Sequence, residues 1–534
     1  MLGQAKDRMK MDVNLTNLSQ QARFYVQRRD WANVYRLAQE ITALNKNEPE
    51  GYFLTGLAEK AAGRVNLAIT ALTQALKIAP YRYDAAIELA QLYLLLLRHG
   101  EAYNLLNSYE QKLVNSPLYL DMAGSIFSAL GLHTRAWALY EKANLLQPDI
   151  DMFRGNLAAC GVLLGKVNEA KAIYSSLIIK YPQHQKNHYE LSKLEPAKNA
   201  EHINQMEEIL KSTESSPDKN IFMYYALGKE LEDLGRWKES FGYYKKAGEA
   251  VLSVANYDVA DEIRVIESII KTCNLEWLSS DTRSKPSKTS AKIPVFIVGL
   301  PRTGTTLVER ILSSHSEVES ADETFFIQMA IRHVSGAGGI NELDETIIKN
   351  AAEKNMDFLA KHYMASVEYR LSGEPMFIDK YPYNYLYLGF IAKAFPQAKI
   401  IYLKRNPLDA CFAMFKQSFF KFAYSLEDLG RYYVAQDKLR KHWQLILGDQ
   451  IIEVDYESLV TNQEFKTKEL LSQIGLEFEP ACLEFEKNTA SSATASTLQI
   501  REKIHARSVY KWKHFADELA PLQTFLEQAG VKTT

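Results

Sequence analysis

Two patterns of apolar residues divide this chain of 534 residues. In the first half, apolar side chains recur at helical spacing, as at Ala71, Leu72, Ala75 and Leu76. In the second half, short apolar runs of strand length, beginning with residues 293–298, alternate with helical patterns. The chain is therefore predicted to fold as an all-α half followed by an α/β domain with a central parallel sheet.

The helical half repeats every 34 residues. Small residues, glycines and prolines keep this phase; they are Ala68, Ala102, Ala136 and Ala170, then Gly63, Gly131 and Gly165, then Pro80, Pro148 and Pro182. The period resembles that of tetratricopeptide repeats (TPRs), and units at 17–50 and 224–250 extend the array. This resemblance implies a solenoid whose concave surface binds a protein or peptide, with formation of a homodimer as the alternative.

The first strand of the α/β half leads into a loop that contains two glycines. Strand, loop and helix N-terminus in this order present backbone N–H groups and the helix dipole to an anion. The spacing Gly299-x4-Gly304 is that of a nucleotide-binding P-loop, but Thr305 occupies the position of the loop lysine. Arg302 lies inside the loop instead. This P-loop-like segment favours one phosphate group over a triphosphate with its metal ion, and a P-loop kinase remains an alternative.

The loop and the residues after it, through Ala321-Asp322-Glu323-Thr324, resemble the phosphosulfate-binding region of sulfotransferases. The similarity is to tyrosylprotein sulfotransferases and their bacterial TPR-containing relatives, whose donor is 3′-phosphoadenosine 5′-phosphosulfate (PAPS). It implies that Glu323 is the general base that removes the proton of the acceptor hydroxyl. It also implies that the donor is bound by the loop residues Arg302, Thr303, Gly304, Thr305 and Thr306.

Three further segments resemble the same family. Lys380, in 375–382, matches the lysine that acts with Arg302 on the leaving phosphate, where new negative charge needs a fixed cation. Arg405, in 399–409, matches the arginine of the 3′-phosphate site, and Tyr456 matches a tyrosine near the adenine. The family pattern expects a serine where this chain has Ala413. The alternatives for the missing contact are Lys404, Lys416 and Ser418.

The terminal segment resembles the part of the family that closes over the donor. Ser496, as a catalytic residue, and Arg501, as a donor-binding residue, are the candidates in 495–501, and 508–512 belongs to the same region. The sequence departs from the family pattern here because Glu502-Lys503 replaces an expected proline.

Composition sets the remaining expectations. Residues 1–275 are predicted to be the TPR solenoid, 276–292 a Ser/Lys-rich linker and 293–534 the sulfotransferase domain. A formal net charge of −2 argues against nucleic acid as a partner. The four cysteines have no metal-binding spacing, and no apolar run is long enough for a signal peptide or a membrane span, so a cytoplasmic protein is expected.

These observations predict an enzyme that moves a sulfuryl group from PAPS to an acceptor hydroxyl without a metal ion. Protein tyrosine is the expected acceptor, because the segment from the loop to Glu323 resembles tyrosylprotein sulfotransferases. A glycan, lipid or small-molecule hydroxyl remains an alternative. So does a TPR scaffold whose sulfotransferase domain has decayed, because Ala413 and the altered terminal segment depart from the pattern.

Overall fold

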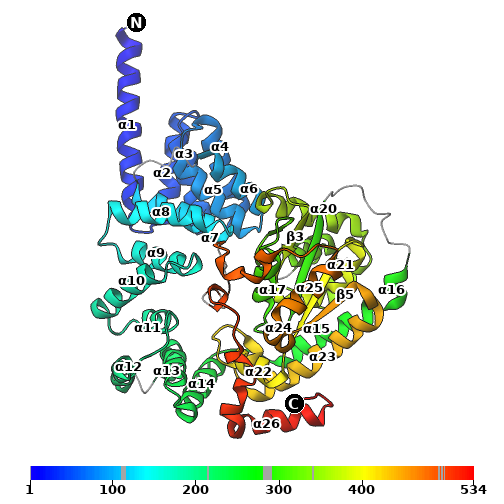
Figure 1. Ribbon diagram of the computed structural model, residues 1–534. Coiled ribbons are helices and arrows are strands. Elements are labelled where there is room, and N and C mark those ends of the chain that lie inside the picture. The colour runs from blue at the N-terminus through cyan, green and yellow to red at the C-terminus, as the bar shows by residue number, and fades with distance from the viewer. Residues whose placement is uncertain are drawn as a thin grey trace. The chain divides into compact units, whose positions relative to one another are not determined.

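The computed structural model describes residues 2–109, 116–212, 216–280, 292–338, 342–490, 494, 497 and 499–533, with side chains from residue 13 onward. The chain divides into two compact units, Met1–Cys160 and Gly161–Thr534. Figure 1 shows helices throughout the first unit, and a sheet flanked by helices in the second.

The first unit consists of paired helices. They are α1 (Leu2–Gln27), α2 (Trp31–Leu44), α3 (Pro49–Ala61), α4 (Val65–Ile78), α5 (Tyr83–Leu95), α6 (His99–Tyr109), α7 (Pro117–Ala129), α8 (His133–Leu146) and α9 (Asp151–Leu163), whose last residues belong to the second unit. The helices α3, α5, α7 and α9 begin 34 residues apart. Ala68, Ala102 and Ala136 are fully buried on the second helices of their pairs. The predicted TPR architecture is confirmed.

The turn between the two helices of a pair uses a left-handed backbone. Gly63, Gly131 and Gly165 have φ angles of 72°, 77° and 75°. The same phase places Arg29 and Leu97 in this conformation, with φ angles of 57° and 58°. Glycine adopts positive φ without a steric cost, so three of these five turns carry the residue that the geometry favours.

The second unit begins with further helices. They are α10 (Val167–Lys180), α11 (Gln185–Ser192), α12 (Glu201–Lys211), η2 (Pro217–Lys219), α13 (Ile221–Asp233), α14 (Trp237–Leu252), α15 (Val259–Thr272) and α16 (Leu275–Ser279). The helices α11 to α16 share an apolar core with the α/β domain; for example, the ring of Phe241 on α14 stacks on Phe415 at 5.5 Å. These helices therefore belong to the same compact unit as the sheet. The predicted division at 275 and 293 rests on repeats and motifs, and residues 281–291 of the predicted linker lie outside the described residues.

The α/β domain is built on a parallel sheet. Its strands are β1 (Ile293–Gly299), β2 (Val318–Ser320), β3 (Met376–Asp379), β4 (Lys399–Lys404) and β5 (Ile451–Asp455), in the order β2-β3-β1-β4-β5. Each neighbouring pair is parallel, with Val295 opposite Ile378 on one side and Lys399 on the other. Because all strands point the same way, their carboxyl ends meet at one edge.

Helices cover both faces of the sheet, as the continuous apolar strands predict. They are α17 (Thr305–Leu312), α18 (Phe326–Ser335), α19 (Glu345–Ala352), α20 (Met356–Val367), α21 (Leu388–Ala394), α22 (Pro407–Phe415), α23 (Leu426–Leu447), α24 (Tyr456–Thr461), α25 (Gln463–Ile474) and α26 (Ala516–Gln528). Val295 and Ile297 pack in a core with α17 and α25, whereas Phe296 and Val298 pack in the core that contains α20, α21 and α23. Successive side chains of a strand alternate between faces, which explains the two cores.

Short 3₁₀ helices also occur in this domain. They are η3 (Glu368–Arg370), η4 (Pro382–Tyr387), η5 (Lys421–Ala423), η6 (Gly448–Gln450), η7 (Pro480–Leu483), η8 (Phe485–Lys487), η9 (Gln499–Arg501), η10 (Ala506–Ser508) and η11 (Lys511–Phe515). Within the described ranges, no helix combines the length and the apolar character that a membrane crossing requires.

Candidate active site

One predicted site residue follows the carboxyl end of each strand of the sheet. Arg302 follows β1, Glu323 follows β2, Lys380 follows β3, Arg405 follows β4 and Tyr456 follows β5. In an open parallel sheet, this edge is where ligands bind. The topology therefore gathers residues that are spread over more than 150 positions of the sequence.

The loop after β1 depends on both glycines. Gly299 has a φ of 146°, and a Cβ atom there would lie 2.6 Å from the carbonyl oxygen of Leu403 on β4. Gly304 has a φ of 100°, and a Cβ atom there would lie 2.5 Å from the ring of Tyr456. The loop is thus fixed between β4 and Tyr456, with its amides at the N-terminus of α17.

Two arginines lie side by side at this loop. Arg405 donates from Nη1 to the carbonyl oxygen of Arg302 at 2.8 Å, and its guanidinium lies 4.9 Å from the ring centre of Tyr456. Arg302 itself adopts a left-handed backbone with a φ of 68°. Burial and the adjacent Arg405 lower the pKa of Arg302 to about 10. Two neighbouring half-buried cations repel each other, and a bound anion would relieve this repulsion.

The loop threonines are buried and mostly turned toward the protein. Thr303 donates to the carbonyl oxygen of Leu300 at 2.6 Å, so this hydroxyl supports the loop. Thr306 donates to Thr494 at 3.3 Å. Thr305 is the first residue of α17 and is 4% exposed. Thr303, one of the residues predicted to bind the donor, thus uses its hydroxyl to hold the shape of the loop.

Glu323 and Lys380 are in direct contact although they lie 57 residues apart. The Lys380 ammonium group is 2.5 Å from Oε1 of Glu323, and its side chain is completely buried while that of Glu323 is 27% exposed. Burial lowers the pKa of Lys380, but Glu323, Glu309 and Asp322 raise it by more. Lys380 therefore stays charged and holds a carboxylate that faces outward.

A buried aspartate that sequence reasoning missed supports this pair. Asp379, the last residue of β3, accepts hydrogen bonds from Thr324 at 2.7 Å, Tyr363 at 2.8 Å and Asn384 at 3.2 Å. Burial raises the pKa of Asp379 to about 6. Thr324 follows Glu323 in the sequence, and Lys380 follows Asp379. This network therefore fixes the distance between the loops after β2 and β3. In the sequence, Asp379 is marked only as a polar residue at the end of an apolar strand.

The terminal segment is anchored beside Arg405. Asp409 on α22 accepts hydrogen bonds from the backbone N–H groups of Tyr510 at 2.6 Å and Trp512 at 2.9 Å. Arg405 also donates from Nη2 to the carbonyl oxygen of Ser508 at 2.6 Å. Residues 508–512 therefore lie against the Arg405 turn, and their closure over the donor stays a prediction.

The structure does not bring every candidate to this edge. Ser496 lies outside the described residues. Arg501 donates from Nη2 to the carbonyl oxygen of Leu163 at 3.4 Å, and its Nε is 2.5 Å from where a Cβ atom of Gly165 would lie. Arg501 thus lies against the turn between α9 and α10, where burial and Arg310 lower its pKa.

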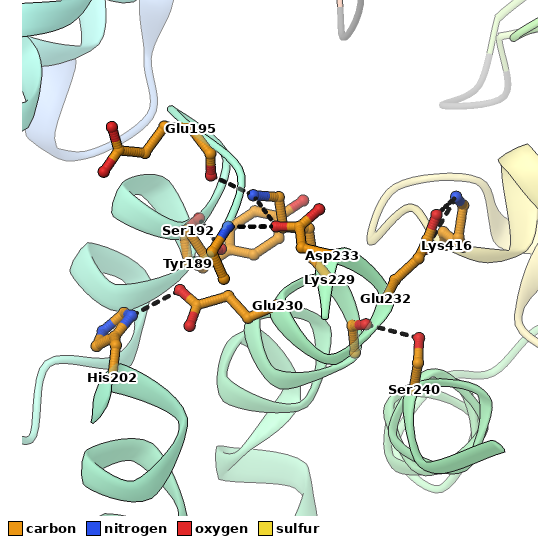
Figure 2. A network of polar contacts seen from close by, with 12 residues as sticks. Tyr189, Ser192, Glu195, His202, Lys229, Glu230, Glu232, Asp233, Ser240 and Lys416 are labelled. Atoms are coloured by element: carbon orange, nitrogen blue, oxygen red, sulfur yellow. Dashed lines mark hydrogen bonds and ion pairs between the residues drawn. The ribbon is translucent and has the colours of Figure 1, made fainter. Parts of the chain in front are cut away.

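The lysines considered as replacements for a serine at position 413 have other partners. Lys404 pairs with Glu453 at 2.8 Å. Figure 2 shows Lys416 directed at Glu232 of α13, and the two side chains are 2.8 Å apart. Lys511 pairs with the same carboxylate at 2.6 Å. Neither Lys404 nor Lys416 is therefore available without breaking an ion pair.

Comparisons with known proteins agree with this geometry. Residues 294–480 match the sulfotransferase family, and residues 60–126 match the tetratricopeptide repeat. An uncharacterized protein of Aquifex aeolicus (strain VF5) is 30% identical over 417 residues, which cover 73% of this chain and 53% of that protein. Protein-tyrosine sulfotransferase 1 of Danio rerio is 25% identical over 237 residues, which cover 41% of this chain and 65% of the relative.

A solved structure of a sulfotransferase domain also matches part of this chain. The sulfotransferase domain from the curacin biosynthetic pathway is 16% identical, covers 46% of this chain and 100% of that domain, and has a TM-score of 0.32. The chain spans about half the length of the Aquifex protein and about two thirds of the zebrafish protein. The family matches and the parallel sheet show that this chain carries a sulfotransferase-family domain preceded by tetratricopeptide repeats.

Proposed function

We propose that this protein transfers the sulfuryl group of PAPS to a tyrosine hydroxyl of a polypeptide. The observation that carries the proposal is the convergence of Glu323, Lys380, Arg302 and Arg405 after four neighbouring strands of the sheet. A carboxylate held by a buried lysine is a base, and two adjacent arginines form an anion site.

The residues present fit a donor with two separate phosphate groups. The amides of the 299–304 loop and Arg302 would hold the 5′-phosphosulfate, and Arg405 would hold the 3′-phosphate. The Nε atom of Arg405 is buried and has no hydrogen-bond partner among the described residues, although both terminal nitrogens donate to backbone oxygens. Tyr456 packs against both Gly304 and Arg405, which places an aromatic face beside the proposed nucleotide site.

Each charged residue has a defined part in the proposed reaction. Glu323 accepts the proton of the acceptor hydroxyl while the acceptor oxygen bonds to sulfur and the bond from sulfur to the phosphate oxygen breaks. Arg302 and Lys380 stabilise the negative charge that grows on the departing phosphate oxygen. These cations act more strongly on the transition state than on the ground state, which is the condition for catalysis.

An exposed aromatic residue supports tyrosine as the acceptor. Phe325 lies two residues after Glu323, is 51% exposed, and packs edge-to-face on Tyr381 at 4.9 Å. Aromatic rings favour such edge-to-face contacts with one another, so this pair offers a surface for a phenol ring next to the base. The similarity to a zebrafish protein-tyrosine sulfotransferase also supports this acceptor. The repeats of the first unit would then bind the polypeptide.

The test uses ³⁵S-labelled PAPS and two peptides that differ only in tyrosine or phenylalanine at one position. We expect label on the tyrosine peptide alone. We also expect Phe325→Ala to raise the KM for that peptide about tenfold, while Phe358→Ala, a change at an exposed phenylalanine on α20, leaves it unchanged. Label that passes only to glycans, lipids or low-mass compounds of a cell lysate would contradict tyrosine as the acceptor.

A further inference from the structure

A second buried carboxylate lies behind the pair of Glu323 and Lys380. Glu309 on α17 is 7% exposed, and its Oε2 is 3.5 Å from the ammonium group of Lys380. Its other oxygen accepts a hydrogen bond from Ser320 of β2 at 2.7 Å. Lys380 is thus shared between an outward carboxylate and an inward one. The proposed reaction assigns no part to Glu309.

The charged groups around Glu309 come from several elements. Lys380 lies after β3, Asp322 and Glu323 lie after β2, and Arg310 is the next residue on α17. Arg310 donates to Asn488 at 3.0 Å and is therefore directed toward the 480–501 segment. Three further groups of charges come from the chain at and after Glu479. Glu479 accepts a hydrogen bond from Ser316, Glu484 and Lys487 form an exposed ion pair, and Arg501 lies beside Arg310. Lys380 is the cation in ion-pair contact with Glu309.

Proton transfer to Glu323 changes the charge balance of this cluster. Before transfer, Lys380 is in ion-pair contact with two carboxyl groups; after transfer, Glu323 is neutral, and Glu309 is the carboxyl group still in contact with the buried ammonium group, with Asp322 farther away. An uncompensated charge in a buried site is costly. An ionised Glu309 therefore favours the proton transfer, whereas a protonated Glu309 opposes it.

We propose that Glu309 is a positioning residue that holds Lys380 and, when ionised, promotes proton transfer to Glu323. This inference rests on the proposed function. Burial raises the pKa of Glu309 to about 7, although Lys380 lowers it in part. The carboxylate thus gains its charge as the pH rises through neutrality, and turnover should increase over the same range.

Glu309→Gln tests the inference because glutamine resembles the protonated carboxyl group in shape and charge. Glu309→Asp restores the charge. The matched control is Glu319→Gln on β2, because Glu319 also pairs with a lysine, Lys292, and its side chain is 8% exposed compared with 9% for Glu309. Initial rates with PAPS and the tyrosine peptide are measured from about pH 5.5 to about pH 9.

In the parent and in Glu319→Gln, we expect the turnover number to rise with an apparent pKa near 7. Glu309→Gln should lose this rise and turn over about tenfold more slowly at pH 8.5, with affinity for 3′-phosphoadenosine 5′-phosphate (PAP) unchanged within about threefold. Glu309→Asp should recover the pH-dependent rise. A rise that persists in Glu309→Gln would overturn the inference, and so would its loss in Glu319→Gln.

A second measurement does not depend on turnover. Infrared difference spectra between acidic and alkaline pH report the C=O stretch of a protonated carboxyl group. Asp379, whose pKa burial raises to about 6, contributes such a band in both proteins. We expect the parent to show a further band that titrates near pH 7 and is absent from Glu309→Gln. Its presence in both proteins would overturn the assignment to Glu309. A parent that shows the band but transfers no label contradicts the proposed function, and the role of Glu309 with it.

Discussion

The charge of Lys380 shows how single residues define this site. Its side chain is completely buried, a position that by itself favours a neutral amine, yet three nearby carboxylates raise its pKa. Glu323 is thereby held at the surface of the site, and Asp379 keeps the two loops together through its hydrogen bonds with Thr324 and Tyr363.

Glu323→Gln should lower turnover by roughly 10²–10⁴-fold, the usual contribution of a general base. Affinity for PAP should change little, because the change removes a proton acceptor and leaves Arg302 and Arg405 in place. Rates with the tyrosine peptide and calorimetric titration with PAP measure the two effects. Turnover within threefold of the parent would remove Glu323 from the mechanism.

Arg405→Ala should weaken PAP binding by about 2–4 kcal/mol, because a charge-assisted contact to the 3′-phosphate is lost. Adenosine 5′-phosphosulfate lacks that phosphate, so its affinity should hardly change. Calorimetry with both nucleotides separates a local effect from a general one. Equal losses for the two ligands would mean that Arg405 supports the loop through Arg302 and does not bind the 3′-phosphate.

At the scale of elements, the inter-helix turn is the feature that the period specifies best. The left-handed conformation recurs at 29, 63, 97, 131 and 165, but only three of these positions hold glycine. Leu97 adopts a φ of 58° that is unfavourable for a residue with a Cβ atom, and its side chain is 48% exposed. Little packing would be lost on its removal.

Leu97→Gly should therefore stabilise the pairing of α5 and α6 by about 0.5–1 kcal/mol, after part of the gain is offset by the greater freedom of glycine in the unfolded chain. Hydrogen exchange of residues 83–109 measures this local stability in the full chain. The control is Leu95→Gly, at the end of α5, which should destabilise the pair by about 1 kcal/mol. Faster exchange in Leu97→Gly would show that the leucine contributes more than its backbone conformation costs.

The sequence predicted elements and missed contacts between distant elements. The 34-residue phase located the helix pairs, and the apolar run at 293–298 located β1. Glycine spacing predicted the loop, but the contact of Lys380 with Glu323 depends on the adjacency of β2 and β3, which no local pattern encodes. Glu309 and Arg310 are consecutive on α17, and no local pattern in the sequence indicates that Glu309 contacts Lys380.

At the scale of the whole molecule, the second unit joins repeat-like helices to the sheet through a buried charge. Glu232 of α13 pairs with both Lys416 and Lys511, and Tyr244 donates to it at 3.1 Å. Figure 2 shows that Glu230 of the same helix is directed elsewhere, at His202. Although burial opposes its charge, Lys416 and Lys511 lower the pKa of Glu232 to about 2.

Glu232→Gln should destabilise the protein by about 3 kcal/mol, because two lysines lose their common partner in a buried site. The folded-state pKa lies below the usual value of 4.5, so this contribution is complete above about pH 5 and declines as the pH falls toward 2. Urea unfolding at several pH values measures it. Glu239→Gln, at an exposed ion pair on α14, is the control and should change stability by less than about 0.5 kcal/mol. A difference that grows as the pH falls would contradict the assignment.

The central claim is that the carboxyl edge of the sheet binds a nucleotide with two phosphate groups by means of side chains and backbone amides. Calorimetric titration with PAP in the presence of a chelator tests it most directly, with ATP and Mg²⁺ as the comparison. We predict binding of PAP that persists in the chelator and weakens in Arg405→Ala, with much weaker binding of ATP. Binding of ATP that requires Mg²⁺, together with no detectable binding of PAP, would contradict the claim and favour a kinase.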